Sequence, residues 1–102
     1  MYFIYILYSE SFDKYYVGYS TSPAERLIRH NTQDYFHTFT SKYRPWSLKA
    51  VFEVSESEGD AVNIERFIKN QKSRKLIEKL CDPEFVPTGK LAQLVRVPYV
   101  RD

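Results

Sequence analysis

The chain has 102 residues, of which 43% are hydrophobic and 27% charged, a balance typical of one globular domain. Its net charge of +2 excludes a general polycation, so any binding to nucleic acid must come from local clusters of Lys and Arg. A single cysteine, Cys81, excludes an internal disulfide and a cysteine-based metal cluster, and we expect a cytoplasmic protein. The apolar opening MYFIYILY is too short for a membrane span and lacks a basic leader, so we expect no membrane association.

Two apolar runs with a polar turn between them predict a β-hairpin, with strands over residues 2–8 and 14–20. A register with Tyr5 opposite Tyr16 would place both rings on one face, because side chains alternate with a period of two. Gly18 falls on the same face, and its missing side chain would leave room there for a ligand or another backbone.

A helix is predicted over residues 22–33, with Ser22 as N-cap and Pro23 in the first helical position. Arg26 and His30 lie four residues apart on it and therefore share one stripe of its surface. A neighbouring stripe is expected to pack on the sheet and consists of Ala24, Leu27, Ile28 and Asn31.

The remaining elements follow from apolar periodicity and capping residues. Residues 34–46 show no clean period and predict an exposed loop, whereas the alternation over 48–55 predicts a third strand. Ser57 and Ser73 cap helices expected over residues 57–70 and 73–80. We expect a domain over residues 1–82, on which the tail, residues 83–102, docks through Leu91, Leu94, Val95 and Val97. The order β-β-α-β-α-α predicts an α+β fold, with a small, three-stranded, mostly antiparallel sheet flanked by helices.

Glu65 is the most informative single residue, because it lies inside the apolar stripe of its helix beside Ala61, Ile64 and Ile68. A carboxylate that faces a core costs several kcal/mol unless it is paired or bound to a metal. One alternative is an ion pair with Lys69 or Arg26; the other is a site for a hard divalent cation. A single carboxylate favours one metal ion over two.

The ordered set of these residues resembles the GIY-YIG nuclease family over about residues 1–80. Tyr16-Val17-Gly18 matches the second half of the signature, whereas Phe3-Ile4-Tyr5 has Phe where the first half has Gly. Arg26 lies ten residues beyond Tyr16 and matches the family's arginine. His30, four residues further on, matches a histidine that is frequent in the family. Glu65 matches the acidic metal ligand. An asparagine that many members carry further on is absent, since Ile77 stands near its position.

The resemblance implies an endonuclease-like protein that hydrolyses DNA phosphodiester bonds, with Glu65 holding Mg²⁺ or Mn²⁺ and no small-molecule cofactor. Arg26 would stabilise charge on the phosphate, and Tyr5 and Tyr16 would position the attacking water and a phosphate oxygen. The base would be Tyr5 or His30, and with His30 as the base activity should level off near pH 7. We favour Tyr5, its pKa lowered by Arg26 and the metal and with His30 assisting, and therefore expect activity to rise above pH 8. The ordinary alternatives are a solvated arginine, a packed histidine and tyrosines of the core.

A cluster of basic residues is the expected DNA interface: Lys42, Arg44, Lys69, Lys72, Arg74 and Lys75. The alternative is a solvated helix face, partly balanced by Glu78. A role in DNA repair or recombination, on branched or damaged duplex, would suit such a protein. The competing hypothesis is a binding module of the same fold with weak or no catalysis.

Overall fold

The computed structural model describes residues 1–33 and 39–98 and contains one four-stranded antiparallel sheet in the order β2-β1-β3-β4. The predicted α+β fold is confirmed, with a fourth strand from the tail where three strands were expected. The elements in chain order are β1 (Tyr2–Ser9), β2 (Lys14–Ser20), α1 (Pro23–Thr32), α2 (Phe39–Lys42), β3 (Ser47–Ser55), α3 (Glu58–Asn70), α4 (Arg74–Cys81), the 3-10 helix η1 (Gly89–Leu91) and β4 (Val95–Arg96).

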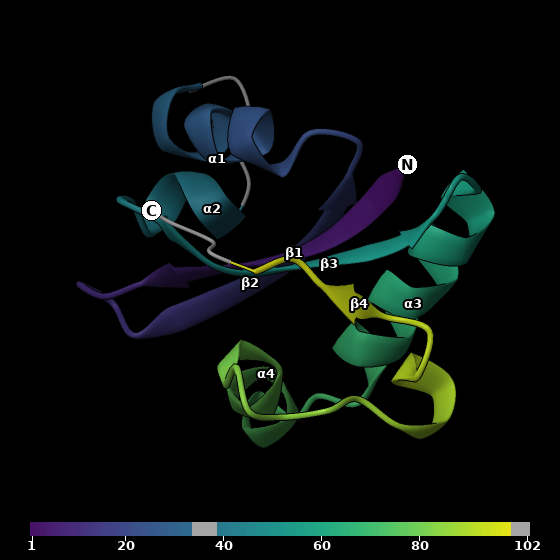
Figure 1. The fold of residues 1–102 in the computed structure, drawn as a ribbon. Helices are drawn as coiled ribbons and strands as arrows, with labels where there is room; N and C mark the ends of the chain where they lie inside the picture. The colour runs from purple at the N-terminus through teal and green to yellow at the C-terminus, as the bar shows by residue number, and fades with distance from the viewer. Residues whose placement is uncertain (34–38, 99–102) are drawn as a thin grey trace.

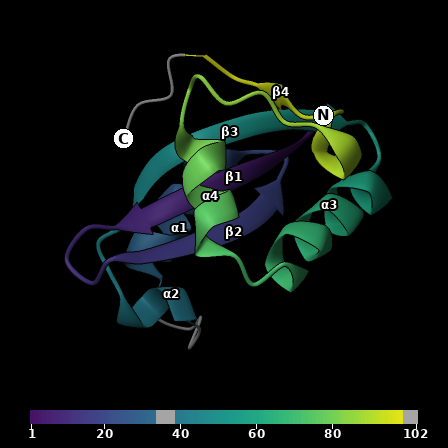
Figure 2. The same ribbon diagram turned by 90° about the horizontal axis from the view of Figure 1, so that it is seen from below.

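The helices form two layers around the sheet: α1 and α2 cover one face, whereas α3 and α4 cover the other (Figures 1 and 2). Both faces of the central strand β1 must therefore be apolar, which explains its unbroken run Ile4-Tyr5-Ile6-Leu7, every residue of which is at most 1% exposed. In the described part of the chain, no helix is both long and apolar enough to cross a bilayer.

The larger core lies under α3 and α4. Ile4, Ile6 and Phe52 of the sheet meet Ile64 and Ile68 of α3, as the predicted apolar stripe requires. Leu80 of α4 and the tail residues Leu91 and Leu94 complete this core, so the described part of the tail packs on the sheet. Val95, expected to dock as well, is 59% exposed, because it lies in the short edge strand β4.

The smaller core lies under α1 and α2 and is built on Tyr5, Leu7 and Trp46. The predicted packing stripe of α1 is partly wrong: Leu27 packs on this core, but Ala24 is exposed and Ile28 is 62% exposed. The helix therefore contacts this core through one side only, by the packing of Leu27 and by the hydrogen bonds of Asn31 to the Trp46 backbone.

The hairpin register differs from the expected one by two residues. Tyr5 pairs with Gly18, and Leu7 pairs with Tyr16. A shift of two residues keeps every side chain on its face, so the rings of Tyr5 and Tyr16 still lie together, with centroids 6.4 Å apart. The space at Gly18 is filled by the Tyr5 ring, not by a ligand, since a Cβ there would lie 2.5 Å from Tyr5 Cζ.

The helix boundaries agree with the capping residues. Ser57 Oγ accepts a hydrogen bond from Asp60 N at 3.4 Å, and Ser73 Oγ accepts one from Leu76 N at 3.1 Å. Pro23 begins α1, but the Ser22 side chain makes no capping hydrogen bond. The N-cap position was predicted, whereas its usual bond is absent.

The expectation of an exposed loop over residues 34–46 is only partly right where the structure describes this segment. Residues 34–38 lie outside the described part, and Phe39–Lys42 form the short helix α2. Thr40 is 2% exposed and Trp46 4% exposed, so the segment folds back onto the sheet. Burial of the large Trp46 ring outweighs the polar composition that predicted a loop.

Candidate active site

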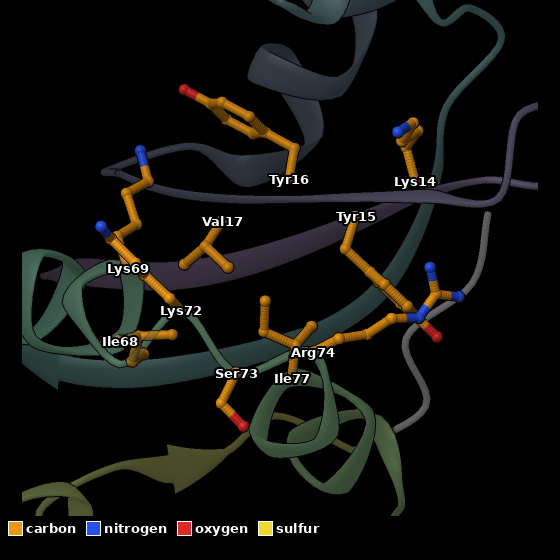
Figure 3. Close-up of a pocket in the computed structure, with 10 residues that line it drawn as sticks. All are labelled: Lys14, Tyr15, Tyr16, Val17, Ile68, Lys69, Lys72, Ser73, Arg74 and Ile77. Atoms are coloured by element: carbon orange, nitrogen blue, oxygen red, sulfur yellow. The ribbon is translucent and has the colours of Figure 1, made fainter.

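Four of the five candidate catalytic residues come from β1, β2 and α1, on the face of the sheet that carries the smaller core: Tyr5, Tyr16, Arg26 and His30. Glu65 comes from α3, which packs beside β2 on the other side of the sheet (Figure 1). The two layers meet at the β2 edge, where Lys69 Nζ of α3 lies 4.9 Å from the centre of the Tyr16 ring. Figure 3 shows Lys69 extending past β2 toward Tyr16. The edge strand is therefore where side chains of both layers converge.

His30 lies at the centre of a short hydrogen-bonded chain. Its Nε2 is 2.9 Å from Tyr5 Oη, and its Nδ1 is 2.9 Å from Thr40 Oγ1. Its ring centre is also 4.9 Å from that of Tyr16. The sequence prediction that His30 assists Tyr5 through a hydrogen bond thus has a matching contact in the structure.

The surroundings of His30 keep its ring neutral. Burial lowers its pKa from 6.5 to about 4, and the positive charges of Arg26, Arg44 and Lys69 act in the same direction. At neutral pH the ring therefore has one free nitrogen lone pair, which can accept a proton or a hydrogen bond.

The two tyrosines are held in their protonated form. Burial is the largest cause that raises the pKa of Tyr5, and Arg26 only partly opposes it. Burial and then the Glu65 carboxylate raise the pKa of Tyr16, again against Arg26. We expected Arg26 to lower the pKa of Tyr5. It does act in that direction, but Arg26 alone does not outweigh desolvation, because Tyr5 is 1% exposed.

The Arg26 side chain is exposed, and its positive charge acts on Tyr5, Tyr16 and His30. A phosphate that approaches from solvent would meet the guanidinium before it met the buried phenol of Tyr5. Arg26 is thus placed to pair with an anion and to bring it to the tyrosines.

Glu65 faces the cluster from α3, and its side chain is 16% exposed. The ion pair expected as one alternative is present, with Lys69 Nζ 3.7 Å from Glu65 Oε2. The carboxylate also acts on Tyr5 and Tyr16. In the described residues no group of three or more His, Cys, Asp or Glu could hold a metal. The donor set therefore fits a cation that takes one carboxylate oxygen and completes its shell with water and phosphate.

A basic groove of about 310 Å³ opens between the β2 edge and the junction of α3 with α4 (Figure 3). It contains three of the predicted DNA-binding residues, Lys69, Lys72 and Arg74, and a fourth cation, Lys14. Lys14, at the start of the edge strand β2, was not among the residues predicted to contact DNA. Tyr16 also lines the groove, so it is continuous with the tyrosine cluster.

The cations of this groove differ in how far they are neutralised. Arg74 forms ion pairs with Asp13 and Glu78, whereas Lys72 has no ion pair with any residue in the described ranges. Lys75 is exposed and lies outside the groove lining. The charge of Lys72 is therefore more available to a phosphate than that of Arg74.

The other two predicted DNA-binding residues lie on the opposite face, in and beside α2. Lys42 is exposed at the end of α2. Arg44 donates to the carbonyl oxygen of His30 at 2.7 Å and to that of Gln33 at 2.6 Å, so it supports the end of α1. These bonds give Arg44 a structural role, and its contact with DNA stays a prediction.

Three residues around His30 were not predicted to support the site: Asn31, Thr40 and Trp46. Asn31 bonds both backbone groups of Trp46, at 3.0 and 2.7 Å, and Trp46 Nε1 donates to the Thr40 carbonyl at 2.8 Å. These contacts depend on how the segment after α1 folds back, for which the sequence offers no periodic pattern. Near the position of the family's asparagine, Ile77 packs against the larger core.

Comparison with known proteins gives one match. A family model described as the GIY-YIG catalytic domain matches residues 1–78. No curated protein and no solved structure matches the chain. The matched segment includes all five residues of the cluster, from Tyr5 to Glu65, and covers well over half of the 102 residues. The chain therefore belongs to the GIY-YIG family, whose catalytic domain is that of endonucleases that act on DNA and generally require a divalent metal.

Proposed function

We propose that this protein is a metal-dependent endonuclease that hydrolyses DNA phosphodiester bonds at the β2 edge. The observation that supports it best is that Glu65 and Arg26, of opposite charge, both act on the half-buried Tyr16. A carboxylate for a cation and a guanidinium for a phosphate thus both lie within electrostatic reach of Tyr16. Tyr16, which borders the groove, would hydrogen-bond a phosphate oxygen there.

Glu65 would hold Mg²⁺ or Mn²⁺, which supplies positive charge to the phosphate when bound. Lys69 would then exchange its contact with Glu65 for one with a phosphate oxygen, since a cation at the carboxylate replaces its charge there. Arg26 would stabilise the negative charge that accumulates on the phosphate during attack.

Tyr5 and His30 would handle the proton of the attacking water. Tyr5 would accept that proton while its own phenolic proton passes to His30 Nε2, 2.9 Å away. This route avoids a free tyrosinate, which the raised pKa of Tyr5 disfavours. His30 returns the proton to solvent or to the leaving oxygen at the end of the cycle.

The basic groove would hold the DNA backbone on one side of the scissile phosphate, through Lys14, Lys69 and Lys72. Branched or damaged duplex is the proposed substrate, in repair or recombination. The single cysteine suits a reducing compartment, so we place the protein in the cytoplasm.

A cleavage screen tests the proposal with single-stranded, duplex, flap and junction DNA, each with Mg²⁺, with Mn²⁺ or with EDTA. Arg26→Ala should lose cleavage, whereas Arg29→Ala on the same helix should keep it, because Arg29 is engaged with Glu25 at 2.8 Å. Cleavage that persists in EDTA, or in Arg26→Ala, would contradict the proposed chemistry.

A DNA-binding module without catalysis is the second candidate, and one observation favours it. In the protein alone, the Glu65 carboxylate is already paired with Lys69, and the Tyr5 phenol is shielded from solvent at 1% exposure. Salt-sensitive DNA binding without cleavage of any substrate in the screen would select this candidate.

A further inference from the structure

Thr40 makes a contact with the proposed catalytic pair that the family resemblance does not account for. Its hydroxyl oxygen is 2.9 Å from His30 Nδ1, on the side of the ring opposite Tyr5. The residue is 2% exposed, so this bond is shielded from water. The hydrogen bond at one ring nitrogen determines whether the other nitrogen carries a proton or a free lone pair.

Thr40 is itself fixed in place. Its carbonyl oxygen accepts the Trp46 indole N–H at 2.8 Å, and the Trp46 backbone is bonded at both groups by Asn31, the residue after His30. The threonine and the histidine are thus joined through Trp46 as well as directly. This closed arrangement holds the distance between Oγ1 and Nδ1.

The hydrogen bonds around Tyr5 select one tautomer of His30. Tyr5 is 1% exposed, so its phenolic proton has no access to solvent and needs an acceptor within the protein. The Tyr5 proton must then point to an acceptor, and in the described part of the chain that acceptor is His30 Nε2. A neutral ring with a free Nε2 has its proton on Nδ1, and Thr40 Oγ1 accepts it.

We propose that Thr40 is a positioning residue that holds His30 in the Nδ1–H tautomer, so that Nε2 faces Tyr5 as a proton acceptor. The role of this tautomer in cleavage rests on the proposed function, whereas the tautomer itself does not. Outer contacts of this kind, which orient a histidine, typically change activity by about 10- to 100-fold when removed.

The tautomer can be measured without substrate, by ¹⁵N–¹H correlation of the imidazole nitrogens at neutral pH. The chain has two histidines, and a His37→Asn variant would identify the signals of His30. Wild type should show a protonated Nδ1. Thr40→Val, which keeps the shape and loses the hydroxyl, should shift the ring toward Nε2–H, and Thr40→Ser should restore Nδ1–H. A wild-type ring protonated at Nε2, or a Thr40→Val ring that is unchanged, overturns the proposal.

Cleavage assays on the same variants test the functional part. Thr40→Val should lower kcat by roughly 10- to 100-fold with little change in KM, and Thr40→Ser should recover most of it. If wild type cleaves nothing, the proposed function fails while the tautomer result stands. Equal kcat for Thr40→Val and wild type overturns the positioning role. If Thr40→Val does not fold, the wild-type and Thr40→Ser spectra still decide the tautomer.

Discussion

Tyr5 lies so closely over Gly18 that a Cβ on residue 18 would be 2.5 Å from both Cζ and Oη of the Tyr5 ring. These two residues are direct partners across the hairpin. The glycine therefore allows the phenol to lie flat on β2 with its hydroxyl toward α1, where His30 Nε2 is 2.9 Å away. One missing side chain thus sets the position of the proposed proton-transfer pair.

Gly18→Ala should destabilise the protein by about 1–3 kcal/mol and displace Tyr5, because backbone and ring cannot both keep their places. Urea unfolding measures the first effect and cleavage the second. Gly59→Ala is the matched control. Its nearest neighbour, Ser57 Oγ, is 3.5 Å away, and alanine in α3 should stabilise the fold by up to about 1 kcal/mol.

A double variant identifies the cause of the Gly18→Ala effect. In Tyr5→Ala the ring is absent, so adding Gly18→Ala should cost much less than it does in wild type. Equal costs in the two backgrounds would show that Gly18 is needed for the strand itself and not for Tyr5.

Glu65→Gln should abolish metal-dependent cleavage and leave the free energy of unfolding and the affinity for DNA nearly unchanged. The amide has the shape of the carboxylate but is a poor ligand for a hard cation. Cleavage as a function of Mg²⁺ concentration measures the loss, and circular dichroism checks the fold.

Lys69→Gln separates the metal site from the ion pair, because it removes the 3.7 Å contact and leaves the carboxylate. If Glu65 is a metal ligand, Lys69→Gln keeps the Mg²⁺ dependence of cleavage, whereas the lost contact to the phosphate should raise KM. Should both variants unfold together, or should Glu65→Gln cut at the wild-type rate, Glu65 is a structural residue.

DNA binding should weaken steeply with salt, and Lys72 and Arg74 should contribute differently. Each phosphate neutralised adds about 0.9 to the slope of log K against log salt on duplex DNA. Lys72→Ala should lower the slope by about that amount, whereas Arg74→Ala should lower it less, because Asp13 and Glu78 already neutralise Arg74. A slope that is unchanged in a Lys72→Ala, Arg74→Ala, Lys75→Ala triple variant would move the interface elsewhere.

Periodic and capping signals predicted β1, β2, β3, α1, α3 and α4, but not α2, η1 and β4. The helix boundaries at Ser57 and Ser73 and the buried stripe of α3 follow from residues a few positions apart. The register of the hairpin did not follow, because a two-residue shift leaves the alternation of faces intact, so no apolar pattern distinguishes Tyr16 from Gly18 as the partner of Tyr5.

Site residues could be predicted where their spacing on one helix brings them together. They could not be predicted where the tertiary fold brings distant segments together. Arg26 and His30 share a stripe by their spacing, whereas Thr40 reaches His30 only because Trp46 folds the segment back. The sign of a net pKa shift also depends on burial, which the sequence cannot supply. The nearby arginine was foreseen, but the 1% exposure of Tyr5 was not.

His30 makes the free energy of unfolding depend on pH in a defined direction. Its pKa is 6.5 in an unfolded chain and about 4 in the folded one, so between these values the unfolded state binds more protons at this residue. The corresponding stability is fully present above pH 6.5 and is lost as pH falls toward 4. Urea midpoints of wild type should therefore fall more over this window than those of His30→Gln. Parallel curves would show that the ring titrates normally.

The last prediction concerns the base. With the pKa of Tyr5 raised and His30 Nε2 as its hydrogen-bond acceptor, the rate should stay level from roughly pH 6 to pH 9, because no tyrosinate has to form beforehand. This differs from the rise above pH 8 expected from the sequence. Tyr5→Phe should be about 100-fold slower or worse, since general acid–base catalysis contributes at least that much. Tyr16→Phe should mainly raise KM, because that hydroxyl is proposed to bind the phosphate.

His30→Ala separates the two routes for the proton. Without the imidazole, Tyr5 can serve as a base only after it ionises, so the variant should be slow at neutral pH and its rate should rise above pH 8. A wild-type rate that rises in the same way would show that tyrosinate acts without His30, and the hydrogen bond between them would then be structural. A largely active Tyr5→Phe would exclude Tyr5 as the base altogether. The pH profiles of these three proteins, measured on one substrate at saturating Mg²⁺, therefore assign the proton to Tyr5 with His30, to Tyr5 alone, or to neither.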